Sequence, residues 1–138
     1  MAMKDLESSL KASTALDIAA ISSDTTTNRN AIDMRGFESV MAAYHSGAYT
    51  DGTYTPLVLE GDTNVIGAAT AVADADLLPS GTGQEASAAI SSANTTTKIG
   101  YRGNKRYVFF SVVSTSTTSG ATVGATAIQG HASEMPVS

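Results

Sequence analysis

The run from Arg106 to Val113 (RYVFFSVV) constrains the fold more than any other part of this sequence. Side chains of a β-strand point alternately to its two sides. Here both alternate sets contain large apolar residues, Val108 and Phe110 in one and Tyr107 and Phe109 in the other. A strand that buries both faces lies inside a sheet that is covered on both sides. We therefore predict a central strand over this run.

Four further runs have the length and alternation of strands, and turn-forming residues separate them. They cover residues 37–46, 55–60, 97–101 and 121–129. Asp51 and Gly52 favour the positive φ of a tight turn, and residues 114–120 form a polar connection. We expect one hairpin to join 37–46 to 55–60 and a second to join 106–113 to 121–129.

Composition supports the same fold class. The chain has 17 Ser, 18 Thr and 12 Gly among 138 residues, and these residue types weaken helix interiors. An all-α fold is therefore disfavoured, and the length fits one domain. We predict an all-β fold, an antiparallel β-sandwich or barrel with an extended N-terminal arm.

The ends of the chain differ from its middle. Residues 1–30 contain few large apolar side chains and include a polar stretch from Ser22 to Asn30. Residues 131–138 have too little apolar content to fold alone. We expect an N-terminal arm over 1–30 that has no core of its own, a β domain over 31–130 and a C-terminal tail over 131–138.

Charge and residue usage argue against several classes of function. The net charge is −5, with only eight Lys and Arg residues, whereas binding to nucleic-acid phosphates needs a clustered basic surface. There is no Cys for disulfides or thiolate chemistry. No apolar run approaches membrane-spanning length, and Asp5 and Glu7 lie where a signal peptide would be basic or apolar. We expect a protein made in a cytoplasm that binds neither nucleic acid nor a membrane.

One basic cluster is a candidate docking site. Arg102, Lys105 and Arg106 lie together just before the predicted central strand. In an acidic protein such a cluster either binds a negatively charged partner or is only a solvated loop. We carry the three residues forward as docking candidates.

The sequence offers no catalytic, cofactor-binding or metal-binding set. Neither His45 nor His131 belongs to a recognisable nucleophile motif. Aromatic and acidic residues flank the Asp-Gly turn, so Tyr49, Asp51 and Tyr54 are candidates for exposed contacts to a glycan or receptor. We expect the protein not to be an enzyme and to need no cofactor.

A series of motifs extends over nearly the whole chain, about residues 4–131. They are Ala31-Ile32-Asp33, Gly36-Phe37, Gly47-x-Tyr49-Thr50-Asp51-Gly52-Thr53-Tyr54-Thr55-Pro56, Leu59-Glu60, Ala75-Asp76-Leu77-Leu78, Lys98-Ile99-Gly100-Tyr101-x-Gly103-x-Lys105-Arg106-Tyr107-Val108 and Gly124-Ala125-x-Ala127-Ile128-x-Gly130-His131. This series resembles a family of small virion proteins of tailed bacteriophages, encoded among head genes. Two departures are the reduced acidic run after Leu59-Glu60 and the missing Pro after Gly130-His131.

The resemblance implies a structural protein rather than an enzyme. It implies a capsid decoration (cement) protein on the outside of the shell, assembled in the host cytoplasm, with the major capsid protein as partner. On the particle we expect a homo-oligomer, a dimer or trimer. A head-tail connector, a tail structural protein and a glycan- or receptor-binding β module remain the alternatives.

Overall fold

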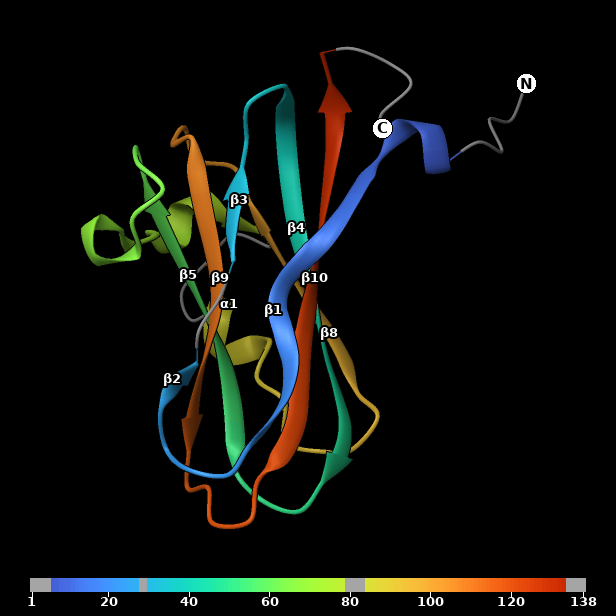
Figure 1. Ribbon diagram of the computed structural model, residues 1–138, viewed down its shortest axis with the longest axis vertical. Coiled ribbons are helices and arrows are strands. Elements are labelled where there is room, and N and C mark those ends of the chain that lie inside the picture. Colours follow the sequence, from blue (N-terminus) through green and yellow to red (C-terminus); the bar gives the residue numbers. More distant parts are fainter. Residues whose placement is uncertain (1–5, 28–29, 79–83, 134–138) are drawn as a thin grey trace.

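The computed structural model describes residues 6–27, 30–78 and 84–133. Two antiparallel sheets pack face to face as a sandwich, which confirms the all-β prediction and decides for the sandwich over the barrel. Figure 1 shows strands β5 and β9 on one side of the molecule and β10, β4 and β8 on the other.

Sheet A has five strands in the order β1-β10-β4-β8-β7, and sheet B has the order β2-β9-β5-β6, with β3 also paired to β9. The strands of sheet A are β1 (Lys11–Ile21), β4 (Phe37–Tyr49), β7 (Leu77–Leu78), β8 (Thr96–Tyr101) and β10 (Ala121–Ala132). Those of sheet B are β2 (Thr26–Thr27), β3 (Ala31–Asp33), β5 (Thr53–Gly61), β6 (Thr70–Ala71) and β9 (Tyr107–Thr115). The helical pieces are α1 (Gln84–Ser87) and three 3-10 turns, η1 (Glu7–Ser9), η2 (Ile66–Ala68) and η3 (Asp74–Asp76).

Strand β9 is central, as the sequence predicted. It pairs with β5 along one edge and with β2 and β3 along the other. Phe110 is fully buried between the sheets, and Phe109, on the opposite side of the strand, is only 2% exposed. Burial of both faces therefore explains the two apolar sets in this run.

Both predicted hairpins are wrong. Strand β4 pairs with β10 and β8, whereas β5 pairs with β9 and β6, so residues 50–52 carry the chain from sheet A to sheet B. The polar run after β9 likewise carries the chain back to β10 in sheet A. Alternation specifies which faces are buried but not which strands pair, and a sandwich accommodates short connections between its two sheets.

The segment predicted as an arm without a core contains a core strand. Strand β1 pairs with β10, and Ala15, Leu16 and Ile21 are buried. Figure 1 shows β1 running along β10 at the edge of sheet A. Register shifts occur on either side of Leu16, so no single period runs along this strand. Residues 1–5, 28–29 and 134–138 of the predicted arm and tail lie outside the described residues, and the tail's His131 and Ala132 belong to β10.

The place of β1 in the core generates the first prediction. Leu16→Ala removes a fully buried side chain and is expected to lower the free energy of unfolding by about 2–5 kcal/mol. Ile18→Ala on the same strand removes a side chain that is 67% exposed and serves as the control, with a much smaller effect. Chemical denaturation measures both. Equal, small losses for the two variants would show that β1 does not contribute to the core.

Candidate functional site

The three predicted docking residues lie in the segment between β8 and β9, and Tyr101 organises this segment. The Tyr101 hydroxyl donates to Glu60 Oε2 at 2.6 Å and accepts from the Lys105 backbone N–H at 3.1 Å. Burial, together with the bond to Glu60, raises the pKa of Tyr101, so the hydroxyl stays protonated as a donor. The ideal Cβ position of Gly103 would collide with the Tyr101 ring, so only glycine fits over it.

Each of the three basic side chains has a partner within the chain. Lys105 Nζ lies 2.8 Å from Asp62 Oδ2, and the hydrogen bond to Asp62 raises the pKa of Lys105. Arg106 pairs with Asp33, and its Cζ atom lies 5.0 Å from the centroid of the Tyr107 ring. Arg102 Nε donates to the Ala75 carbonyl at 3.0 Å.

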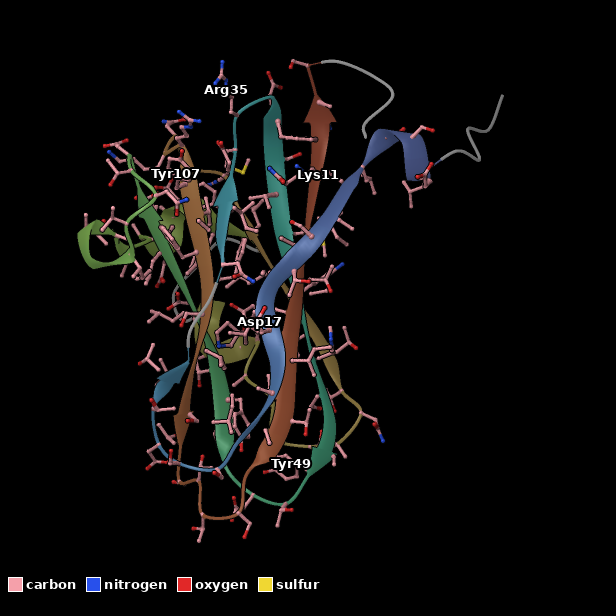
Figure 2. All side chains as sticks on the ribbon, in the orientation of Figure 1. Lys11, Asp17, Arg35, Tyr49 and Tyr107 are labelled. Atoms are coloured by element: carbon pink, nitrogen blue, oxygen red, sulfur yellow. The ribbon has the colours of Figure 1, made fainter. Side chains whose placement is uncertain are left out.

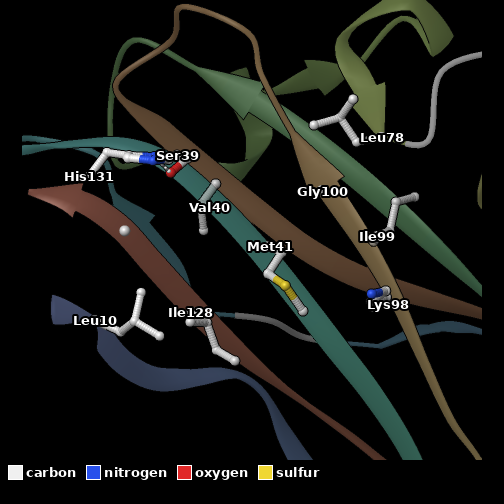
Figure 3. A pocket seen from close by; sticks show the side chains of 11 residues that line it. Leu10, Ser39, Val40, Met41, Leu78, Lys98, Ile99, Gly100, Ile128 and His131 are labelled. Atoms are coloured by element: carbon white, nitrogen blue, oxygen red, sulfur yellow. Dashed lines mark hydrogen bonds between the residues drawn. The ribbon is translucent and has the colours of Figure 1, made fainter. Parts of the chain in front are cut away.

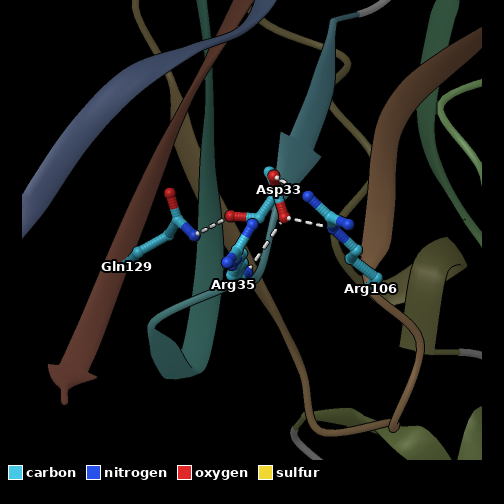
Figure 4. Close-up of polar contacts among 4 residues, drawn as sticks. All are labelled: Asp33, Arg35, Arg106 and Gln129. Atoms are coloured by element: carbon cyan, nitrogen blue, oxygen red, sulfur yellow. Dashed lines mark hydrogen bonds and ion pairs between the residues drawn. The ribbon is translucent and has the colours of Figure 1, made fainter.

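Asp33 is the partner of Arg106. Its two carboxylate oxygens accept from the Arg106 guanidinium at 3.1 and 3.0 Å (Figure 4). This bond, helped by the Arg35 backbone N–H, holds the pKa of Asp33 below its ordinary value, whereas desolvation opposes the shift. Gln129 of β10 donates to the Asp33 carbonyl at 2.9 Å and so links sheet A to this end of β3. The structure thus places the basic cluster in an internal network, and its role in docking stays a prediction.

The turn candidates lie at the opposite end of the sandwich, as the positions of Tyr49, Arg35 and Tyr107 show in Figure 2. The expectation that all three are exposed is wrong for Tyr54, which is fully buried. Its hydroxyl donates to the Asp51 carbonyl at 3.0 Å, and the Tyr49 hydroxyl donates to the Gly52 carbonyl at 2.7 Å. The rings pack edge to face with centroids 6.4 Å apart. Both tyrosines therefore build the turn.

Asp51 ties together two of the connections that pass between the sheets, β4 to β5 and β9 to β10. Its carboxylate accepts from three consecutive backbone N–H groups, those of Thr118, Ser119 and Gly120, at 2.9–3.2 Å. These bonds, the one from Gly120 foremost, hold the pKa of Asp51 below its ordinary value of 3.8. The Asp51 side chain is thus committed to a structural role in the turn.

An apolar groove on the outer face of sheet A is the feature that sequence reasoning missed. Its volume is about 460 Å³. It is lined by residues of β10, β4, β8 and β7, together with Leu10 before β1: Leu10, Ser39, Val40, Met41, Leu78, Lys98, Ile99, Gly100, Ile128, Gly130 and His131. Figure 3 shows Leu10 and Leu78 on opposite sides of the groove, with Met41 between them.

A weak signal for the groove was present in the sequence. Strand 37–46 has two partly apolar sets of alternate residues, and only the set containing Val40, Ala42 and Tyr44 is in the core. The other set includes Met41, which is partly exposed on the outer face. Without the pairing of β4 with β8 and β10, nothing in the sequence indicated that Ile128 and Leu78 join it.

The two histidines lie apart on this sheet. His131 lines the groove and adopts a positive φ of 52°, and its Nδ1 lies 2.6 Å from Ser39 Oγ. His45 lies further along β4, beside Gly124 of β10 and Thr96 of β8. Among the described residues there is no group of three or more His, Cys, Asp or Glu side chains arranged to hold a metal ion. Within the same described ranges, no helix is long and apolar enough to span a membrane.

Comparison with solved structures shows a likeness in fold. One similar structure is the crystal structure of PBSX exported protein XepA, with a TM-score of 0.54 and 21% sequence identity. The match covers 93% of this chain and 39% of the XepA chain, so this chain spans about two fifths of its length. Neither the models of protein families nor the curated proteins give a match. At this identity the likeness establishes a shared fold.

The Asp51 network generates the second prediction. A carboxylate whose pKa is lowered by folding stabilises the protein above its unfolded pKa, and this stabilisation is lost as the pH falls through the folded pKa. Asp51→Asn is therefore expected to lower the thermal midpoint at neutral pH, and the difference from the parent protein should shrink as the pH falls below about 4. Glu38→Gln, at an exposed carboxylate on β4, is the control. A midpoint difference that does not change with pH would contradict a role for the Asp51 charge.

Proposed function

We propose that this chain is a structural virion protein that binds the outside of a phage capsid shell and stabilises it. The observation that carries the proposal is the outer face of sheet A, where Met41, Leu78 and Ile128 form an open apolar groove on an otherwise hydroxyl-rich domain. Apolar surface left open on a small domain is typical of a site for another macromolecule.

Two further observations support a phage particle as the setting. The motifs from Ala31 to His131 resemble those of small tailed-phage virion proteins. In fold the chain resembles XepA, a protein of the phage-like element PBSX. Because a decoration protein binds the assembled shell and not its separated subunits, many copies would stabilise that shell by mass action. An oligomer would strengthen weak individual contacts through effective concentration.

A head-tail connector or tail role is the second candidate, because XepA is called an exported protein and its name assigns it no capsid role. A glycan-binding role has less support, since the hydroxyls of Tyr49 and Tyr54 both donate to backbone carbonyls of their own turn. We regard an enzymatic role as the least supported.

The third prediction tests the decoration role. Shells assembled without this protein are incubated with the purified chain, and bound copies are counted against the major capsid protein. A ratio near one, or a fixed simple fraction, is expected, together with genome release at a higher temperature than from bare shells. Only a few copies per particle and unchanged heat resistance would contradict decoration and favour the connector or tail role.

A further inference from the structure

The register of sheet A determines which side chains form its outer face. Directly paired residues of antiparallel strands point to the same side. Met41 of β4 pairs with Gly100 of β8 and Ile128 of β10, whereas the neighbouring Ala42 is in the core. The outward positions of the three central strands are therefore 39, 41, 43 and 45 in β4, 96, 98 and 100 in β8, and 122, 124, 126, 128 and 130 in β10.

Two glycines let the leucines on either side of the groove pack closely on the sheet. A Cβ at Gly100 would lie 3.1 Å from Leu78 Cβ, and one at Gly130 would lie 3.1 Å from Leu10 Cδ2. Neither glycine has a positive φ, so the backbone conformation does not require them. Each glycine therefore lets a leucine of this chain pack closely on its strand, and Leu10 and Leu78 form the two walls of the groove. The space between these walls is lined mainly by apolar residues and can admit an apolar segment.

The charge on this face is opposite to that of the whole protein. The chain has a net charge of −5, yet none of the residues that line the groove is acidic. The ionisable residues at the outward positions are His45 and Lys98, and His131 also lines the groove. A surface of this composition complements apolar side chains accompanied by carboxylates.

The same charges argue against a second copy of this chain as the occupant. A twofold interface brings the same patch of both copies together. If the outer faces of sheet A from two copies packed together, both Lys98 side chains would lie in the same interface. The central strands of neither copy would supply a carboxylate to pair with them. The favoured occupant is therefore a different chain of opposite charge.

We propose that the outer face of sheet A docks on the shell by taking up a protein segment that carries apolar side chains flanked by carboxylates. The apolar side chains fill the groove over Met41 and Ile128, and a carboxylate pairs with Lys98. This inference rests on the proposed decoration function and names the face and the partner chemistry. It also moves the docking site from the Arg102, Lys105 and Arg106 loop, whose side chains already bond within the chain.

The fourth prediction measures the affinity of variants for shells that lack the protein. Lys98→Glu reverses the charge on the face, and Leu78→Ser removes an apolar group from its rim. Each is expected to raise the dissociation constant about tenfold or more, because each removes a contact on which the proposed interface depends. Binding of the parent chain should also weaken as the salt concentration rises.

Matched controls make the test specific. Lys11→Glu reverses the charge of an exposed lysine on β1 that does not belong to the outer face, because Lys11 pairs with the core-facing Gln129. Val65→Ser removes an apolar side chain that is 55% exposed just before η2. Both should bind like the parent chain. Circular dichroism and the thermal midpoint confirm that each variant is folded. Because Lys98 is exposed, we expect Lys98→Glu to fold normally. The docking face can therefore still be tested if Leu78→Ser does not fold.

The outcomes separate this inference from the proposed function. If the parent chain binds and both face variants bind as tightly as their controls, the docking face is wrong and the decoration function stands. If the Arg102, Lys105 and Arg106 triple change to Ala weakens binding while the face variants do not, the site is the basic loop. If the parent chain does not bind shells at all, the decoration function fails and this inference fails with it.

Discussion

A buried hydrogen bond joins the centres of the two sheets, and the way β4 and β9 face each other across the core depends on it. Tyr44 of β4 is fully buried, and its hydroxyl donates to the Ser111 carbonyl of β9 at 2.6 Å. A buried hydroxyl without a partner is costly, so this bond ties the centre of sheet A to the centre of sheet B. Burial raises the pKa of Tyr44, which keeps the donor protonated. Ser111 lies between the residues of β9 that pair with β3 and those that pair with β2.

The strand that supplies this tyrosine also supplies the middle of the candidate docking face. Val40, Ala42 and Tyr44 point into the sandwich, and the residues between them, Met41 included, point outward. Core packing on one side of β4 therefore determines the position of the groove on the other. Strand β4 pairs with β10 along one edge and with β8 along the other. The outer face is therefore continuous over these three strands.

The sequence correctly predicted the features that depend on the local alternation of apolar and polar residues. It did not predict the features that depend on which strands pair. The two apolar sets of residues 106–113 correctly indicated a central strand, and the strands over 37–46, 55–60, 97–101 and 121–129 were all found. The hairpins were wrong because the turn at Asp51 and Gly52, like the polar run after β9, carries the chain between sheets. Leu16 was missed because register shifts beside it break the period of β1. The groove joins residues from distant strands, Leu78 and Ile128 among them, so it exists only after pairing is known.

We propose that this sandwich binds a phage shell through the outer face of sheet A. An electron cryo-microscopy map of particles carrying the protein tests it most directly, because it shows which face of the sandwich contacts the shell. We expect Met41, Lys98 and Ile128 to face the shell, against apolar and acidic residues of the capsid protein. A map in which these residues face solvent, while the loop of Arg102 and Lys105 contacts the shell, would contradict it.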